Sequence, residues 1–135
     1  MKLSVLDTSA CAAVMRRDDV MAEFLHARAP GSVALVPPVV SEIEFGIRRL
    51  DSDSRKRSLL QQELQRILDA IRVLEWTAAA SSFFGEIKAQ LERAGTPIDD
   101  MDVAIAAVAA AHDAEVITAN VVHFSRVTAI STRYW

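Results

Sequence analysis

The sequence predicts an α/β domain with a central, mainly parallel sheet of four to five short strands, covered by helices on both faces. Two observations carry this prediction. The strand-like runs are short and continuously apolar, which is typical of strands that are buried on both faces. Segments with helical character lie between these runs along the chain, and this alternation is what a parallel sheet requires.

Local signals mark the expected elements. The first strand, 2–6, is followed by DTSACAAVM, where Thr8 or Ser9 can cap a helix. Pro37-Pro38 ends the strand 32–36, and Gly95 ends the helix 77–95. The other expected strands are 72–76, 115–119 and 127–131, and the other expected helices are 18–29, 39–50, a long helix ending near Ile71, and 100–113.

The composition indicates one globular domain over residues 1–135, because a chain of 135 residues can bury a core without disulfides. No apolar run reaches the roughly 18 residues of a membrane helix. Cys11 is the only cysteine, so no internal disulfide can form and a cytoplasmic location is expected. The net charge of −3 supplies no overall basic field for nucleic acid, so any such contact must be local.

Several familiar kinds of site are missing from the sequence. The four glycines fit neither a phosphate-binding GxxxxGK loop nor GxGxxG. There is no GxSxG motif. His26, His112 and His123 lack the spacing of zinc ligands, and we expect each of them to be structural or at the surface. Carboxylates are the remaining candidates for chemistry.

Polar side chains stand at the edge of the sheet where open parallel sheets bind ligands. Asp7 ends the first strand, and Thr118 and Asn120 come at the end of the strand 115–119. Asp7 also has the position of a helix N-cap, and the sequence alone does not decide between capping and chemistry.

Three aspartates gather at the start of an alanine-rich helix. Asp99 fits the N-cap, which puts Asp102 at the third helical position, and acids in a first turn suit the helix dipole. Capping accounts for one or two of Asp99, Asp100 and Asp102. We therefore expect one of them to point inward and join Asp7.

Two glutamates compete for a role in the helix 39–50. Glu42 and Glu44 lie on either side of its apolar face, so periodicity does not choose between them. Gly46, one turn after Glu42, leaves space beside that carboxylate and favours Glu42. Phe45 is expected on the outward face, where an aromatic side chain suggests a protein contact.

Four motifs in this order carry a resemblance to a known family: LDTS at 6–9, SEIEFG at 41–46, GTPIDDMDVAIAA at 95–107 and VITANVVHFSRV at 116–127, with Trp135 at the C-terminus. The chain resembles PIN-domain ribonucleases, specifically the VapC-type toxins of bacterial VapBC toxin–antitoxin pairs, over nearly its whole length. The resemblance implies a PIN-like three-layer α/β/α sandwich. It also implies a metal-dependent endoribonuclease that hydrolyses phosphodiester bonds in RNA, such as tRNA.

The resemblance also implies a site. Asp7, Glu42 and Asp102 match the family's three metal-binding acids, and Asn120 stands at a fourth catalytic position where many members have aspartate. Ser9 matches a small polar residue that supports the first acid, and the candidates for further support are Thr118, Asp99 and Asp100. The implied cofactor is Mg²⁺, with Mn²⁺ as a substitute, since hard cations prefer oxygen ligands. A bound cation would offset the repulsion among the carboxylates.

The implied partners are a cognate VapB-type antitoxin, an RNA substrate and a second copy of the chain in a homodimer, with a higher assembly in the presence of antitoxin and no membrane. The charged stretch 48–57 is a candidate RNA contact, and Phe45 and the Phe83-Phe84 pair are candidate protein contacts. The alternative is a catalytically weak PIN-like module that only binds RNA or protein.

Two unrelated classes fit the sequence less well. A phosphate-accepting receiver domain needs a lysine after its last strand, and this chain has none there. A haloacid-type phosphatase needs an aspartate two residues after Asp7, where Ser9 stands.

Overall fold

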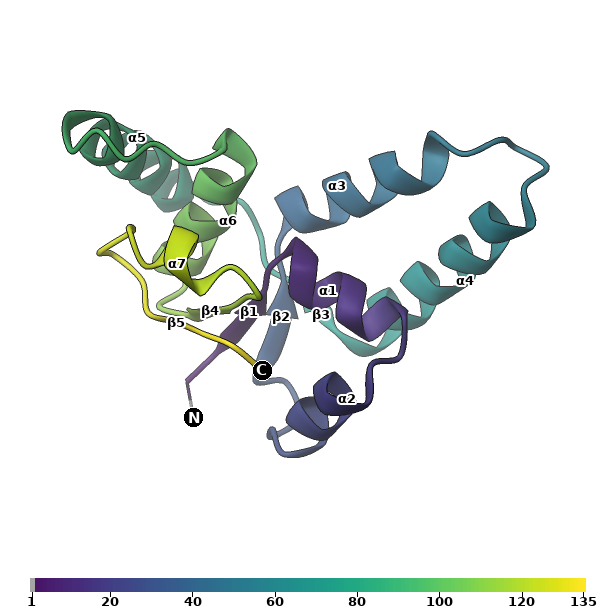
Figure 1. The fold of residues 1–135 in the computed structure, drawn as a ribbon. Helices are drawn as coiled ribbons and strands as arrows, with labels where there is room; N and C mark the ends of the chain where they lie inside the picture. Colours follow the sequence, from purple (N-terminus) through teal and green to yellow (C-terminus); the bar gives the residue numbers. More distant parts are fainter. Residues whose placement is uncertain (1) are drawn as a thin grey trace.

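A computed structural model describes residues 2–135, in which strands and helices alternate as expected (Figure 1). In chain order the elements are β1 (Ser4–Leu6), α1 (Thr8–Met15), α2 (Asp19–His26), β2 (Val33–Leu35), α3 (Pro37–Arg48), α4 (Arg55–Ala70), β3 (Arg72–Val73), α5 (Ala78–Arg93), α6 (Asp100–Ala111), β4 (Glu115–Ile117), α7 (Val121–Phe124) and β5 (Thr132–Arg133).

The five strands form one parallel sheet in the order β3-β2-β1-β4-β5. Val5 of the central strand pairs with Ala34 of β2 and with Val116 of β4, and all three are fully buried. From β1 the chain continues to β2 on one side, whereas from β4 it continues to β5 on the opposite side. The carboxyl ends of β1 and β4 therefore flank the point where the connections reverse direction, which is where open parallel sheets bind ligands.

The last strand lies later in the chain than its sequence pattern predicted. Residues 127–131 were expected as a strand, but they form turns, and the pairing to β4 begins at Thr132. Val127 is buried in the core as a single anchor of this turn. The prediction was wrong because its apolar residues pack inward from a turn and not from a strand.

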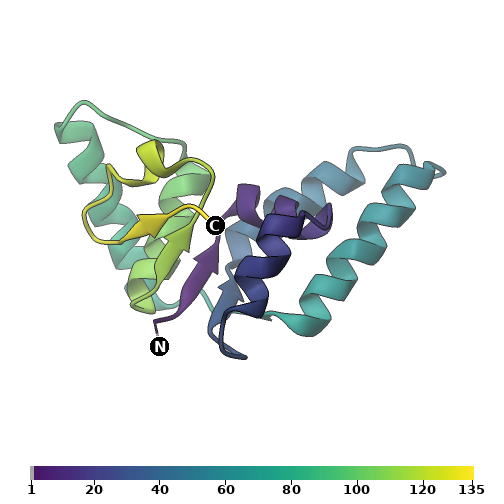
Figure 2. The same ribbon diagram turned by 60° about the horizontal axis from the view of Figure 1, so that its bottom comes forward.

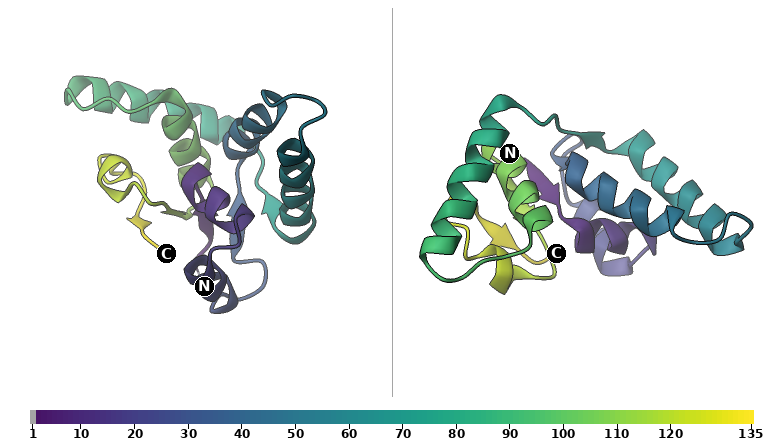
Figure 3. Two further views of the ribbon diagram at one scale, coloured as in Figure 1. Left: turned by 45° about the vertical axis from the view of Figure 1, so that its right-hand side comes forward. Right: turned by 90° about the horizontal axis from the view of Figure 1, so that it is seen from above.

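Helices cover both sides of the sheet. α5 and α6 pack together on one side, while α1, α2, α3 and α4 lie on the other, which gives the expected three layers (Figure 3). α3 and α4 form a hairpin that projects beyond the sheet (Figure 2). Within residues 2–135, no helix has the length and apolar character needed to cross a membrane.

α6 is the most deeply buried helix of the fold. Residues 103–109 are all buried, and the helix contacts α5, α3 and β4. Its small alanines allow this close approach on several sides, and a helix that is apolar all round belongs inside a protein. Because α6 ends just before β4 begins, its first turn lies at the carboxyl edge of the parallel sheet.

Asp7 is the N-cap of α1, which is one of the two alternatives that the sequence offered, and neither Thr8 nor Ser9 is the cap. Oδ1 of Asp7 accepts a hydrogen bond from the backbone N–H of Ala10 at 2.8 Å. The hydroxyls of Thr8 and Ser9 donate to the carboxylates of Glu42 and Asp7, which is why neither serves as the cap.

Replacing Ile105 by alanine tests the packing of α6. Ile105 is fully buried, so the variant leaves a cavity, and we expect the free energy of unfolding to fall by about 2–4 kcal/mol. Val122 is 76% exposed, so Val122→Ala is the control and is expected to change that free energy by less than about 0.5 kcal/mol. Urea unfolding followed by circular dichroism measures both. Equal losses in the two variants would contradict the buried position of α6.

Candidate active site

The Asp7 carboxylate is held by three hydrogen-bond donors. Oδ1 accepts from the Ala10 N–H at 2.8 Å and from the Ser9 hydroxyl at 2.6 Å, and Oδ2 accepts from the Thr118 hydroxyl at 2.6 Å. Asp7 is only 4% exposed and Thr118 is fully buried. One carboxylate therefore ties the end of β1 to the start of α1 and to the end of β4.

The same two hydroxyls also fix the chain that follows β4. Oγ of Ser9 accepts from the backbone N–H of Ala119 at 3.0 Å, and Oγ1 of Thr118 accepts from the N–H of Asn120 at 2.8 Å. Ser9 and Thr118 thus both contact Asp7 and set the position of Asn120. The supporting role that the sequence analysis expected for the two residues at a metal site stays a prediction.

The structure distinguishes between the two glutamates of α3. Oε1 of Glu42 accepts a hydrogen bond from the Thr8 hydroxyl at 2.7 Å, which places this carboxylate next to the start of α1. Glu44 is 41% exposed and lies 3.7 Å from Arg48 on its own helix. A Cβ atom at Gly46 would meet no atom within 4 Å in the described part of the chain, so the space expected beside Glu42 is present. Glu42 is therefore the glutamate that reaches the start of α1, where Asp7 is the N-cap.

The three aspartates at the start of α6 have three different surroundings. Asp99 caps the helix by accepting from the Met101 N–H at 2.8 Å. Asp100 is exposed and pairs with Lys88 of α5 at 3.0 Å, so the structure does not bring it to the other acids. Asp102 is 25% exposed and faces His123 of α7, with 3.9 Å between Oδ2 and Nδ1.

The environment of Asp102 disfavours its charged form. The pKa of this carboxyl is raised from 3.8 to about 6, first because burial disfavours the charged form and then because of the nearby charge of Asp99, while a protonated His123 opposes the rise. The charges of Asp7 and Glu42 also raise the pKa. Asp7, Glu42 and Asp102 therefore share one electrostatic neighbourhood, and a positive charge placed there would relieve their repulsion.

Asn120 and His123 form a further polar contact at this edge. Nδ2 of Asn120 lies 2.7 Å from Nδ1 of His123, three residues later on α7. The sequence prediction included Asn120 but treated His123 as a structural or surface residue. The signal that identifies His123 is its spacing of three residues from Asn120, and this spacing has meaning only if a helix begins at residue 121.

The donors at this edge suit a hard divalent cation. Carboxylate and carboxamide oxygens are the ligands that Mg²⁺ prefers. Within residues 2–135, no three acidic, histidine or cysteine side chains are close enough to enclose an ion by themselves. In proteins Mg²⁺ keeps several waters and binds to one or two carboxylates directly.

The side chains reach this edge from the amino-terminal parts of three helices. Asp7 caps α1, Glu42 lies within the first two turns of α3, and Asp102 lies in the first turn of α6. Figure 1 shows these helices meeting above the carboxyl ends of the central strands. The positive ends of the helix dipoles at this edge partly offset the charge of the acids.

Comparison with known families identifies the fold. The family model described as "PIN domain" matches residues 4–130. The chain belongs to the PIN domain family. This PIN domain is 27% identical over 133 residues to a protein named "Ribonuclease VapC2" from Rickettsia felis, with 97% of this chain and 96% of that protein covered. It is 25% identical over 131 residues to the "tRNA(fMet)-specific endonuclease VapC" of Shigella flexneri, with the same shares covered.

Solved structures share the same fold. The "Crystal structure of VapBC2 from Rickettsia felis bound to a DNA fragment from their promoter" contains a chain that matches this PIN domain with a TM-score of 0.87, 23% identity and 98% of each chain covered. The "Crystal structure of DNA bound VapBC from Salmonella typhimurium" matches with a TM-score of 0.86 and 23% identity, covering 100% of this chain and 99% of that one.

A groove of about 380 Å³ leads away from Glu42 of this PIN domain. Its walls are mainly apolar and come from α1, α3 and α4. The lining residues are Ala12, Met15, Arg16, Glu42, Ile43, Gly46, Ile47 and Leu60. Glu42 therefore belongs to the acidic edge and also lines an apolar groove.

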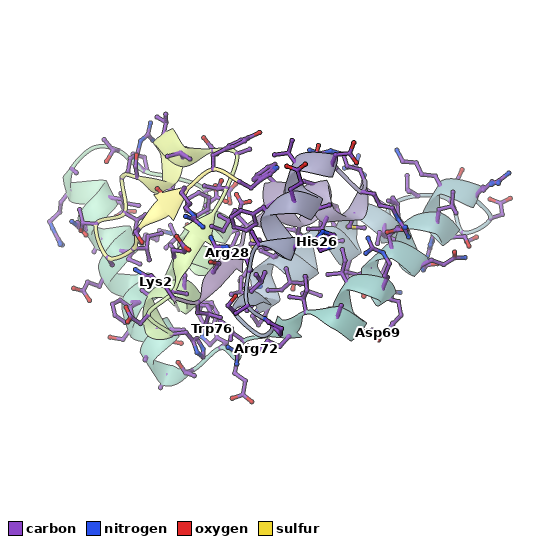
Figure 4. The ribbon with its side chains drawn as sticks, turned by 90° about the horizontal axis from the view of Figure 1, so that it is seen from below. Lys2, His26, Arg28, Asp69, Arg72 and Trp76 are labelled. Carbon is purple, nitrogen blue, oxygen red and sulfur yellow. The ribbon has the colours of Figure 1, made fainter. Side chains whose placement is uncertain are left out.

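The amino-terminal end of the sheet has a different character. A groove of about 510 Å³ there is bordered by His26, Arg28 and Arg72 among other residues, and Figure 4 views this end. Arg28 is bound within the fold, because it lies 3.5 Å from Glu115 and over the ring of Phe24 at 4.4 Å. The sequence-predicted site residues all belong to the opposite end of the sheet.

In metal-free buffer at about pH 8, we expect Asp102→Asn to raise the free energy of unfolding by on the order of 1–2 kcal/mol. Folding raises the pKa of Asp102 from 3.8 to about 6. The stabilising contribution of this carboxyl is complete while it is protonated below about pH 4 and is lost as the pH rises through about 6. The advantage of the asparagine variant should therefore grow across this range, as measured by urea unfolding at a series of pH values with EDTA present.

Asp100→Asn is the matched control, since it makes the same chemical change two residues earlier. Asp100 is exposed and paired with Lys88, so its replacement is not expected to stabilise the protein at any pH. A wild-type protein as stable as Asp102→Asn at about pH 8 would show that the acids carry no electrostatic cost.

Proposed function

We propose that this PIN domain is an endoribonuclease that uses carboxylate-bound Mg²⁺, or Mn²⁺ in its place, and that it acts as the toxin of a type II toxin–antitoxin pair. The observation that carries the proposal is that Asp7, Glu42 and Asp102 come from three helices at the carboxyl edge of the sheet and share one electrostatic neighbourhood, because the charges of the first two raise the pKa of Asp102. The names of the relatives, a ribonuclease and a tRNA endonuclease, support RNA as the substrate.

The three acids would hold the cation directly or through water, with the Asn120 side chain completing the set. A bound Mg²⁺ lowers the pKa of a water and offsets charge on the phosphodiester oxygens. Asp7 is suited to a fixed ligand position, because three hydrogen bonds already define its orientation. Glu42 is oriented by Thr8, which leaves its second carboxylate oxygen for the site.

Asp102 has the role that depends most on the cation. Its pKa of about 6 means that part of the population is protonated near neutral pH when no cation is present. Cation binding favours the charged form, so binding releases protons in this range. Asp99 acts as the cap of α6 and adds negative charge near Asp102, which is a supporting contribution to the site.

RNA would reach the acids at the open carboxyl edge. Basic side chains must hold it locally, because the chain has a net charge of −3. The stretch 48–57 lies at the tip of the α3–α4 hairpin, and three of its arginines already have partners within the fold. Arg48 pairs with Glu44, and Arg49 lies over the Phe45 ring at 5.9 Å. Arg57 donates a hydrogen bond to the carbonyl of Leu50. Arg16 is a further candidate, because it lines the same groove as Glu42. We favour a structured RNA such as a tRNA as the substrate.

The apolar groove between α1, α3 and α4 is our proposed binding site for a segment of a VapB-type antitoxin. An amphipathic segment can bury its apolar side chains there, and its end would then reach Glu42. The solved relatives from Rickettsia felis and Salmonella typhimurium are described as VapBC complexes, which supports a partner of this kind. Phe45 is 68% exposed and remains a candidate contact in a homodimer or in the larger assembly with antitoxin.

The first test is cleavage of tRNA and of another structured RNA by purified, antitoxin-free protein with Mg²⁺, with Mn²⁺ and with EDTA. We expect cutting only with metal, and a loss of at least about 100-fold in Asp102→Asn and in Glu42→Gln, since removing a group that stabilises developing charge typically costs this much. Glu44→Gln is the matched control and should cut within about twofold of wild type, because Glu44 is exposed and pairs with Arg48. Folded wild-type protein that cuts no RNA with either metal would instead support the module that only binds RNA or protein.

Gly46→Leu tests the groove. The open space at Gly46 allows a leucine side chain to enter the groove without a clash in the described structure. We expect the cognate antitoxin to bind at least about 10-fold more weakly, a difference of about 1.4 kcal/mol, as measured by calorimetry. Gly85→Leu is the control, because Gly85 is also open, lies in a helix, and is outside the groove. Equal antitoxin affinity in both variants would place the antitoxin elsewhere.

A further inference from the structure

The side chain of Asn120 has an unusual role for a residue that begins a helix. Asparagine at this position normally accepts a hydrogen bond from a backbone N–H of the first turn. Within residues 2–135, the Asn120 side chain makes no such bond to α7. Its Nδ2 lies instead 2.7 Å from Nδ1 of His123. The side chain is therefore oriented by His123 and not by the helix backbone.

A carboxamide has two chemically different ends, and only the oxygen can bind a cation. When the His123 ring is neutral and carries its proton on Nε2, the amide N–H of Asn120 donates to the lone pair of Nδ1, and the Asn120 oxygen is left for another partner. An asparagine in the opposite orientation would present its N–H groups, which repel a cation. The orientation of this one amide therefore decides whether the fourth position can serve a metal site.

His123 itself lies between two of the site residues. Its Nδ1 is 3.9 Å from Oδ2 of Asp102, too far for a hydrogen bond, and 2.7 Å from Asn120. The next residue, Phe124, is 1% exposed and anchors α7 in the core. The backbone of Asn120 is fixed separately by its hydrogen bond to Thr118. Both ends of the Asn120–His123 contact are thus held by the fold.

We propose that His123 is a positioning residue that fixes the carboxamide of Asn120 with its oxygen available to the divalent cation or to a water bound to it. This inference rests on the metal site of the proposed function. An acid at position 120 would need no such partner, because both of its oxygens are equivalent. The asparagine in this chain needs one, and His123 supplies the hydrogen-bond acceptor.

The test measures Mn²⁺ binding to the whole protein by the loss of the free-ion signal in electron paramagnetic resonance, with no RNA present. His123→Leu keeps a side chain of similar size but removes the acceptor. We expect it to bind Mn²⁺ about 10-fold more weakly than wild type, the lower end of the usual effect of a residue that orients a metal ligand. His123→Asn places an acceptor oxygen where Nδ1 stands, and it should bind within about twofold of wild type.

A double variant separates positioning from a general loss of structure. Asn120→Ala should weaken Mn²⁺ binding to a similar degree, and adding His123→Leu to it should cause no further loss, since the two residues act through one contact. Additive losses, or wild-type affinity in His123→Leu, would overturn the role of His123. Melting temperatures in EDTA check that each variant is folded.

Mn²⁺ binding by the wild-type protein and by Asp102→Asn distinguishes a failure of the role of His123 from a failure of the proposed function. Wild-type binding of Mn²⁺ that is lost in Asp102→Asn keeps the metal site, whatever the His123 variants do. Absence of Mn²⁺ binding to the wild-type protein would overturn the metal site and the role of His123 together.

Discussion

The fold of this PIN domain and its acidic edge both depend on one carboxylate, that of Asp7. It caps α1 through Ala10 and accepts from the hydroxyls of Ser9 and Thr118, so three parts of the chain meet at one buried charge. A buried carboxylate is costly unless its lone pairs are used. These bonds use both lone pairs of Oδ1 and one of Oδ2, so that one lone pair of Oδ2 is left for a cation under the proposed function. Because these bonds hold Asp7 in place, the ends of β1 and β4 can pack next to its negative charge.

The sequence could predict most of this arrangement, because local chemistry determines it. A short apolar strand that ends in aspartate and is followed by a helix places Asp7 at the carboxyl edge in any parallel α/β fold. Capping and chemistry were alternatives on sequence grounds. In the structure Asp7 is both the cap of α1 and a member of the acidic edge, so the two interpretations are compatible.

Other features depend on contacts between distant parts of the chain and were not predictable in this way. Periodicity did not choose between Glu42 and Glu44 and Gly46 only favoured Glu42, whereas the hydrogen bond from Thr8 of α1 distinguishes the two directly. The pairing of Asp100 with Lys88 depends on how α5 packs against α6. His123 was missed because α7 is a single short turn, and its ring acquires a role only when that turn lies beside Asp102.

The charge surplus at this edge links metal binding to inhibition under the proposed function. Burial, together with the charges of the neighbouring acids, raises the pKa of Asp102 to about 6, so the metal-free protein is less stable than an uncharged version of the site would be. Any cation that enters the edge recovers this energy, whether it is a metal ion or a basic side chain. Because Glu42 also lines the apolar groove, a partner bound in that groove is positioned to place such a side chain among the acids. A basic side chain of a partner bound in the groove would then compete with the metal ion for the same carboxylates. Such a partner would inhibit RNA cleavage without contacting the rest of the RNA-binding edge.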